Sequence, residues 1–167
     1  MSQAPTIFVG LVPDANVLID YVESDKDVLT VIAHHLATIH VPSPVLAEVR
    51  KLPAREAARV GVEVLEPTLT QATEAAQGSG PTSFQDRLCL IVARDKGWAC
   101  LTNDKALRKA CQDAGVRCVW GLEAMVILVR AGHLSAKRAW AAGQRIAASN
   151  PYITKDILGR FKEQIGA

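Results

Sequence analysis

Val12-Pro13-Asp14-Ala15-Asn16-Val17-Leu18-Ile19-Asp20 is the stretch on which the predicted fold is built. An apolar run from Ile7 to Val12 leads into it and is typical of a buried strand. After Pro13 the apolar residues recur at helical spacing up to Val22. Ligands bind beyond the carboxyl ends of parallel strands, so Asp14 is expected at the mouth of a site. Capping of the following helix is the alternative role for this carboxylate.

The composition predicts one globular domain in a cytoplasmic protein. The chain has 167 residues, 49% of them hydrophobic, and a net charge of +2. Aromatic residues make up only 5%, which argues against a platform for stacking single-stranded bases. The four cysteines form no C-x-x-C pair and are expected to be reduced residues of the core. Residues 1–6 do not resemble a secretion signal, and the apolar run 124–129 is too short to span a bilayer.

Strand and helix patterns alternate along the chain, which predicts an α/β fold with a parallel sheet. The expected strands are Ile7–Val12, Ile39–Val41, Val62–Leu65, Trp98–Leu101 and Val116–Val119. The expected helices after the Asp14 segment are 28–37, 43–52, 54–60, 68 or 70 to 77, 83–96, 102–115, 122–130, 135–148 and 154–165. In the helix 43–52, Ser43 is the expected N-cap and Pro44 the first helical residue.

Four carboxylates share one placement relative to these strands. Asp14 follows the first strand, Glu48 lies on the helix after the second, Asp86 opens the helix before the fourth, and Asp104 follows that strand. Each has an alternative role as a helix cap or a partner of the helix dipole, and Ser83-x-x-Asp86 has the spacing of a capping box. Right-handed crossovers place the carboxyl ends of all parallel strands on one rim, so we expect the four acids to meet there.

Such a cluster favours one kind of chemistry. Neighbouring carboxylates repel one another unless a cation compensates their charge. Oxygen ligands without His or Cys select a hard ion, Mg²⁺ or Mn²⁺. One or two such ions activate water and stabilise the oxygens of a phosphodiester under attack, so we expect a metal-dependent phosphodiester hydrolase.

The segments around the four acids resemble the PIN-domain nuclease family, and most closely its VapC-type toxin ribonucleases. The resemblance rests on Asp14-x-Asn16-Val17-Leu18-Ile19-Asp20, Glu48, Asp86-Arg87-Leu88 and Leu101-Thr102-Asn103-Asp104-Lys105-Ala106-Leu107-Arg108. It covers about residues 7–131, with all four acids in the family's order. A lone D-x-N motif would be a weak signal, whereas four acids in matching surroundings are a strong one.

The resemblance implies a fold, an activity and a set of site residues. The fold is a Rossmann-like three-layer sandwich with strand order 3-2-1-4-5. The activity is that of an Mg²⁺- or Mn²⁺-dependent endoribonuclease, which cuts in a single step and leaves 5′-phosphate and 3′-hydroxyl ends. The metal would be held by Asp14, Glu48, Asp86 and Asp104. Asn16 and Thr102 would support these ligands, although both are also ordinary residues for a helix start. Asp20 matches the family but lies too far along its helix to join the site.

Basic residues near the acids are candidate contacts for RNA phosphates, because an acidic pocket alone would repel RNA. They are Arg50, Lys51, Arg55, Arg87, Lys105 and Arg108. For each of them a solvated surface charge is the alternative role.

The expected organisation is a PIN-like nuclease domain at residues 1–131 and a helical C-terminal extension at 132–167. Apolar residues of the last helix, among them Phe161 and Ile165, form an amphipathic face. That face packs on its own domain or forms an interface with a second copy or an antitoxin. The family's toxins are dimers neutralised by a cognate antitoxin, so the resemblance implies a homodimer, an antitoxin partner and an RNA substrate.

Three other functions remain as alternatives. A PIN nuclease in RNA processing, or a catalytically inactive PIN fold that only binds, would share the same sequence features. A metal-dependent phosphotransfer domain is disfavoured: Asn16 stands where a haloacid-type phosphatase has a second Asp, and Trp120-Gly121 follows the last strand where a receiver has Lys.

Overall fold

The computed structural model describes residues 8–167, and its centre is a five-stranded parallel sheet in the order β3-β2-β1-β4-β5. The strands are β1 Gly10–Pro13, β2 Thr38–Pro42, β3 Val62–Leu65, β4 Ala99–Leu101 and β5 Cys118–Val119. All five predicted strands are present, and the strand order matches a PIN-like fold. The predicted strand start at Ile7 and the prediction about residues 1–6 lie outside the described residues.

Ten helices occupy the described part of the chain. They are α1 Ala15–Ser24, α2 Asp27–His35, α3 Ser43–Leu46, α4 Ala54–Arg59, α5 Leu69–Gln77, α6 Phe84–Lys96, α7 Lys105–Asp113, α8 Gly121–Arg130, α9 Ala136–Ser149 and α10 Lys155–Ile165. Their caps follow the sequence closely. At five N-caps, the side chain accepts a hydrogen bond from a backbone N–H in the first turn of the helix that follows; these residues are Asp14, Thr68, Ser83, Ser135 and Thr154. Gly97 ends α6 with a φ of 71°, a left-handed conformation that glycine adopts without steric cost.

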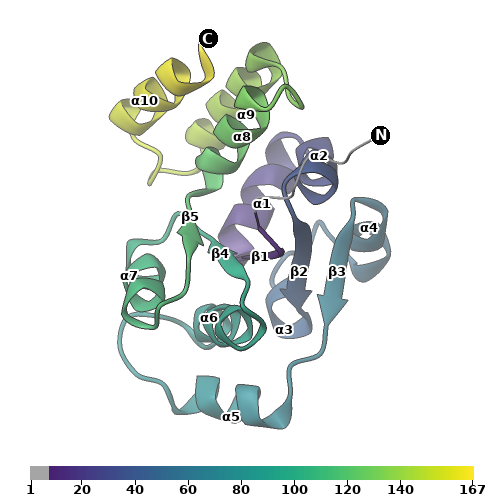
Figure 1. Cartoon of the computed structure of the whole chain (residues 1–167), viewed down its shortest axis with the longest axis vertical. Helices are drawn as coiled ribbons and strands as arrows, with labels where there is room; N and C mark the ends of the chain where they lie inside the picture. Colours follow the sequence, from purple (N-terminus) through teal and green to yellow (C-terminus); the bar gives the residue numbers. More distant parts are fainter. Residues whose placement is uncertain (1–7) are drawn as a thin grey trace.

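The helices cover both faces of the sheet and make three layers (Figure 1). On one face α6 contacts β1, β2 and β4, and α7 packs beside it. On the other face α2 contacts β2 and β3, and α8 packs against α2. Side chains of the inner strands are fully buried between these layers, including Leu11 of β1, Ile39 of β2 and Leu101 of β4, whereas the edge strand β3 exposes Glu63 and Val64. Burial on both faces explains why β1 and β4 are continuous apolar runs, whereas the sequence of the edge strand β3 alternates.

The predicted helix 43–52 is wrong in its length and in its cap. The helix ends at Leu46, Pro42 occupies the N-cap position, and the Ser43 hydroxyl donates to a Glu66 carboxylate oxygen at 2.8 Å instead. Residues 47–52 continue as tight turns, in which the backbone N–H groups of Glu48 and Val49 bond to carbonyls three residues back. These turns still bury the apolar side chains that suggested a helix, because burial of Val49 does not require helical geometry. Glu48 therefore stands on a turn.

The C-terminal helices are joined to the body of the sheet domain by polar contacts as well as by apolar packing. Arg138 of α9 pairs with Asp25 at 2.8 Å between Nε and Oδ2, and the Arg145 guanidinium donates to the backbone oxygen of Ser24. The buried hydroxyl of Tyr21 donates to the backbone oxygen of Gly121 at the start of α8. Helix α10 packs on α8 and α9 (Figure 1). Residues 132–167 thus pack on the domain that precedes them.

Two observations concern the chemistry of the chain as a whole. All four cysteines are free; Cys89, Cys100 and Cys111 are buried and Cys118 is half-buried, as expected for residues of the core. Between residues 8 and 167 no helix has both the length and the apolar character that a membrane crossing requires.

Asp20 lies on the buried side of α1. Because its pKa is raised, we expect it to make the free energy of unfolding depend on pH. Burial raises the pKa of Asp20 to about 6, against the effect of the hydrogen bond that Asn150 donates to its Oδ2 at 2.9 Å. The folded protein therefore holds this proton to a higher pH than the unfolded chain, whose Asp titrates near 3.8. The free energy of unfolding then falls as the pH rises from about 4 to about 6, and is level above that range.

We expect Asp20→Asn to be about 1 kcal/mol more stable than the wild type near pH 7.5, because it removes the buried charge and keeps an oxygen for Asn150. Urea denaturation at about pH 4 and pH 7.5 measures the difference. Asp113→Asn, which changes an exposed acid paired with Lys109, is the control and should shift stability by less than about 0.5 kcal/mol. A variant Asp20→Asn with the pH dependence of the wild type would contradict this assignment.

Candidate active site

Asp14 is the centre of the predicted site, and the structure holds its carboxylate in a fixed position. It follows the central strand β1, caps α1, and is only 2% exposed. The Val17 N–H donates to its Oδ1 at 2.8 Å, and the Thr102 hydroxyl donates to its Oδ2. The sequence left two alternative roles for Asp14, a helix cap and a site residue. In the structure the same side chain caps α1 and lies at the candidate site. Each carboxylate oxygen accepts one hydrogen bond and keeps a lone pair for another partner.

Thr102 connects Asp14 to Asp104. It follows β4 and is fully buried, and its hydroxyl oxygen also accepts the Asp104 N–H at 3.0 Å. Asp104 caps α7 by accepting the Leu107 N–H at 2.9 Å, and its side chain is exposed. The ends of two adjacent strands, β1 and β4, are therefore tied together through one hydroxyl group.

Asp86 and Glu48 complete the group of acids. Asp86 lies in the first turn of α6, where its backbone N–H donates to the Ser83 hydroxyl at 3.1 Å, and its side chain is half-buried. Glu48 is exposed on the turn after α3, a short helix that packs against α6. Asp86 is close enough to Asp14 and Asp104, which follow β1 and β4, for their charges to interact, and Glu48 is close enough to Asp86.

The pKa values of these acids indicate that they interact with one another. Burial raises the pKa of Asp14 to about 6, and the charges of Asp86 and Asp104 add to the rise. Burial also raises the pKa of Asp86, where hydrogen bonds with Ser83 oppose it and the charge of Asp104 adds to it. The pKa of Glu48 is raised by partial burial and then by the charge of Asp86. The four acids are therefore close enough for their charges to interact, and they form one negatively charged cluster.

The donor atoms of this cluster suit a hard divalent ion, because all of them are carboxylate oxygens. Among residues 8–167, however, no group of three His, Cys, Asp or Glu side chains is arranged closely enough to hold a metal ion. Asp14 is fixed and Asp104 is held at the cap of α7 by the Leu107 N–H, whereas Glu48 is an exposed side chain on a turn that can change rotamer at small cost. Coordination by the whole set therefore requires Glu48 to move toward the other acids.

The other predicted site residues differ in whether they contact the acids, are exposed, or are paired within the protein. Thr102 contacts the acids, whereas Asn16 is exposed on the first turn of α1. Arg50 and Lys105 are exposed, and Lys51 is paired with Glu23 at 3.1 Å. Arg87 and Arg108 make intramolecular contacts instead, which are described next.

Arg87 and Arg108 have structural partners that the sequence did not indicate. Arg87 donates from Nε to the Ala75 oxygen at 2.7 Å and from a terminal nitrogen to the Thr82 oxygen, so it fastens the end of α5 to α6. The guanidinium of Arg108 lies 4.2 Å from the Trp120 ring centroid, and its Nη1 is buried without a hydrogen-bond partner in the described residues. Both contacts favour a structural role over an RNA contact for these two arginines.

Cys89 and Asn103 lie near the site, and the sequence analysis did not name them as site residues. The buried Cys89 on α6 has its thiol 3.7 Å from the Pro13 carbonyl oxygen, and burial followed by the charge of Asp14 raises the pKa of this thiol. Asn103 accepts the Gly121 N–H at 2.9 Å and ties the end of β4 to α8. A Cβ at Gly121 would lie 2.7 Å from the Asn103 amide nitrogen, so the glycine allows this close approach. The glycine at the start of an apolar helix was the available signal.

The comparisons with known proteins agree with the fold. Models of known protein families give no match to the sequence, and a search of curated proteins gives none either. Among solved structures, the chain is similar to a PilT N-terminus domain protein from the hyperthermophilic archaeon Sulfolobus solfataricus P2. The TM-score is 0.53 at 12% sequence identity, over 75% of this chain and 94% of that chain. The chain therefore has a PIN-like (PilT N-terminus) α/β fold with an acidic cluster at the carboxyl ends of its strands.

Proposed function

We propose that this protein is a metal-dependent endoribonuclease with Asp14, Glu48, Asp86 and Asp104 as its metal-binding acids. One observation carries the proposal: at the edge of the sheet, acids from separate segments are close enough for their charges to interact, so that Asp86 and Asp104 raise the pKa of Asp14 and Asp86 raises the pKa of Glu48. A cluster of repelling charges destabilises the fold, so its presence is explained best by a function. The PIN-like fold supports the same class of activity.

The residues of the cluster and the cations beside it would have different roles in catalysis. Asp14, held by Val17 and Thr102, and Asp104, held by its cap of α7, would supply ligands in fixed positions, while exposed Glu48 would supply a ligand that adjusts to the substrate. A divalent ion bound there lowers the pKa of a water molecule and stabilises negative charge on phosphate oxygens. Exposed cations such as Lys105 would offset the repulsion between the acids and the RNA backbone.

Cleavage of a pooled single-stranded RNA, with Mn²⁺ or with excess chelator, tests the proposal. We expect cutting with Mn²⁺, products with 5′-phosphate ends, and no cutting in chelator. Equal cutting in excess chelator would exclude the metal mechanism. Failure to cut RNA under any metal would exclude the nuclease and leave a PIN fold that only binds.

The finer proposal is that the protein is the toxin of a type II toxin–antitoxin pair, acting as a homodimer with a cognate antitoxin. It is supported by the resemblance of the Asp14, Asp86 and Asp104 segments to VapC-type toxins. Expression of the wild type should then arrest growth, and a small protein encoded directly upstream should restore it. A housekeeping nuclease would show neither the arrest nor the rescue.

Thr102→Val tests whether the buried hydroxyl positions Asp14. The variant keeps the shape of the side chain but removes the donor to Asp14 and the acceptor for the Asp104 N–H. We expect a 10- to 100-fold slower cleavage, as for other residues that orient metal ligands. Initial rates over a range of Mn²⁺ concentrations measure it. Thr102→Ser keeps the hydroxyl and should retain most of the activity; equal loss in both variants would point to packing instead.

A further inference from the structure

A small pocket lies directly beside the acidic cluster, between α1 and the turn after α3. It has a volume of about 210 Å³, and Glu48 lines it as well as belonging to the cluster. Its apolar part consists of Ile19 and Val22 from α1 and Val49 from the turn. Ile19 lies five residues after Asp14, which is about 7.5 Å along the helix axis. Since Glu48 belongs to both, a group bound at the Glu48 end of the pocket is close to a phosphate held at the acids.

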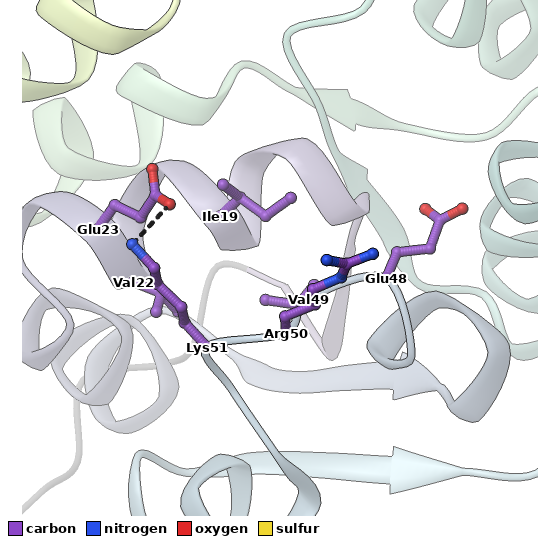
Figure 2. A pocket seen from close by; sticks show the side chains of 7 residues that line it. All are labelled: Ile19, Val22, Glu23, Glu48, Val49, Arg50 and Lys51. Carbon is purple, nitrogen blue, oxygen red and sulfur yellow. Dashed lines mark ion pairs between the residues drawn. The ribbon is translucent and has the colours of Figure 1, made fainter.

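Charged side chains stand at both ends of this pocket. Figure 2 shows Glu23 and Lys51 at one end, Glu48 at the other, and the Arg50 guanidinium between Ile19 and Glu48. Lys51 Nζ and Glu23 Oε1 are 3.1 Å apart, so a donor and an acceptor are presented side by side. Glu23 is 37% exposed and Lys51 is 71% exposed, which leaves both able to bond to a further partner.

These features match one unstacked nucleobase. A base is flat, has apolar faces, and carries donors and acceptors along one edge. Unstacked bases of RNA bind proteins by stacking on arginine guanidinium planes and by hydrogen bonds on their Watson–Crick edges. The pocket offers Arg50 and aliphatic side chains for the faces, and the Glu23–Lys51 pair for the edge.

We propose that this pocket binds a single base of the RNA next to the cleaved phosphate, and that the Glu23–Lys51 pair selects guanine. This inference rests on the proposed ribonuclease function. Guanine alone has two adjacent donors, N1–H and N2–H, on its Watson–Crick edge, and these fit the two oxygens of a carboxylate. Its O6 then accepts from the Lys51 ammonium. Adenine, cytosine and uracil each place an acceptor next to their donor, so one carboxylate oxygen would face a lone pair.

The first test measures cleavage preference in short RNAs that differ at a single position. We expect the wild type to cut about tenfold or more faster with guanine than with adenine at one position next to the cut. Glu23→Gln and Lys51→Met should reduce this ratio to about twofold or less, because each removes one of the edge contacts. Glu74→Gln and Lys109→Met are matched controls, since both change exposed, ion-paired residues on other helices, and they should keep the ratio.

The second test separates the pocket from catalysis. Trinucleotides with guanine or adenine are titrated into the wild type and Glu23→Gln without added metal, and the backbone amide signals of residues 19–23 and 48–51 are followed. Tighter binding of guanine to the wild type alone supports the pocket, even if no RNA is cut. Cleavage or binding without a guanine preference, or a preference unchanged in Glu23→Gln, would overturn it. A chain that binds guanine but cuts no RNA would contradict only the proposed nuclease.

Discussion

Asp14→Asn is expected to lower RNA cleavage by on the order of 100- to 1,000-fold while leaving the protein folded. The substitution removes the one rigid, buried carboxylate of the cluster. An asparagine in its place still has a carbonyl oxygen to cap α1 at the Val17 N–H. It also removes a buried charge that Asp86 and Asp104 repel. The free energy of unfolding near pH 7.5 should therefore equal that of the wild type within about 1 kcal/mol, or exceed it.

Cleavage rates with Mn²⁺ and urea denaturation of the same preparation measure both parts of this prediction. Asp20→Asn is the matched control, because it makes the same change at a buried aspartate on the same helix, outside the cluster. It should keep wild-type cleavage. Activity lost together with stability would indicate that Asp14 serves only as a helix cap, and full activity in Asp14→Asn would exclude it as a metal ligand.

Phe161→Ala is expected to lower the free energy of unfolding by about 3–5 kcal/mol. Phe161 on α10 is 2% exposed and fits against Gly143 of α9. A Cβ at position 143 would lie 2.5 Å from the Phe161 ring, so the glycine makes room for the aromatic side chain. Loss of the ring leaves a cavity between the two helices that their backbones cannot close without moving.

Urea denaturation followed by circular dichroism measures this loss. Ile157→Ala on the same helix removes a side chain that is 39% exposed, and should cost about 1 kcal/mol or less. Because α9 is bonded to α1 through Arg138 and Arg145, we expect one cooperative transition in each variant. A separate early transition in Phe161→Ala would indicate that α10 is an independently unfolding appendage.

The sequence predicted the elements well because their signals are local. The buried strands β1 and β4 are apolar runs between helices and the edge strand β3 alternates, and all five strands appear within a few residues of the predicted bounds. Caps such as Asp14 and Ser83 marked helix starts, since a short polar side chain satisfies a free N–H only there. The error at residues 43–52 has a local cause too: apolar spacing indicates which residues are buried, and tight turns bury Val49 as well as a helix would.

The acids themselves were also predictable from the sequence. Asp14 and Asp104 come directly after strands, and the handedness of parallel crossovers places such residues on one rim of a sheet. Glu48 lies close enough to Asp86 for the two charges to interact although its predicted helix was wrong, because the turn that replaces the helix starts from the same strand end.

What the sequence determined by itself is thus the succession of strands and helices along the chain, every discussed cap except that at Ser43, and the rim on which the acids gather, since short-range geometry and the handedness of L-residues set these. Only the tertiary structure decided which charges are paired. Arg87 binds backbone carbonyls, Lys51 pairs with Glu23 at one end of the pocket, and the Thr102 hydroxyl joins the Asp14 carboxylate to the Asp104 N–H. These contacts depend on side chains that lie far apart in the chain and meet at distances of about 3 Å, which no spacing pattern encodes.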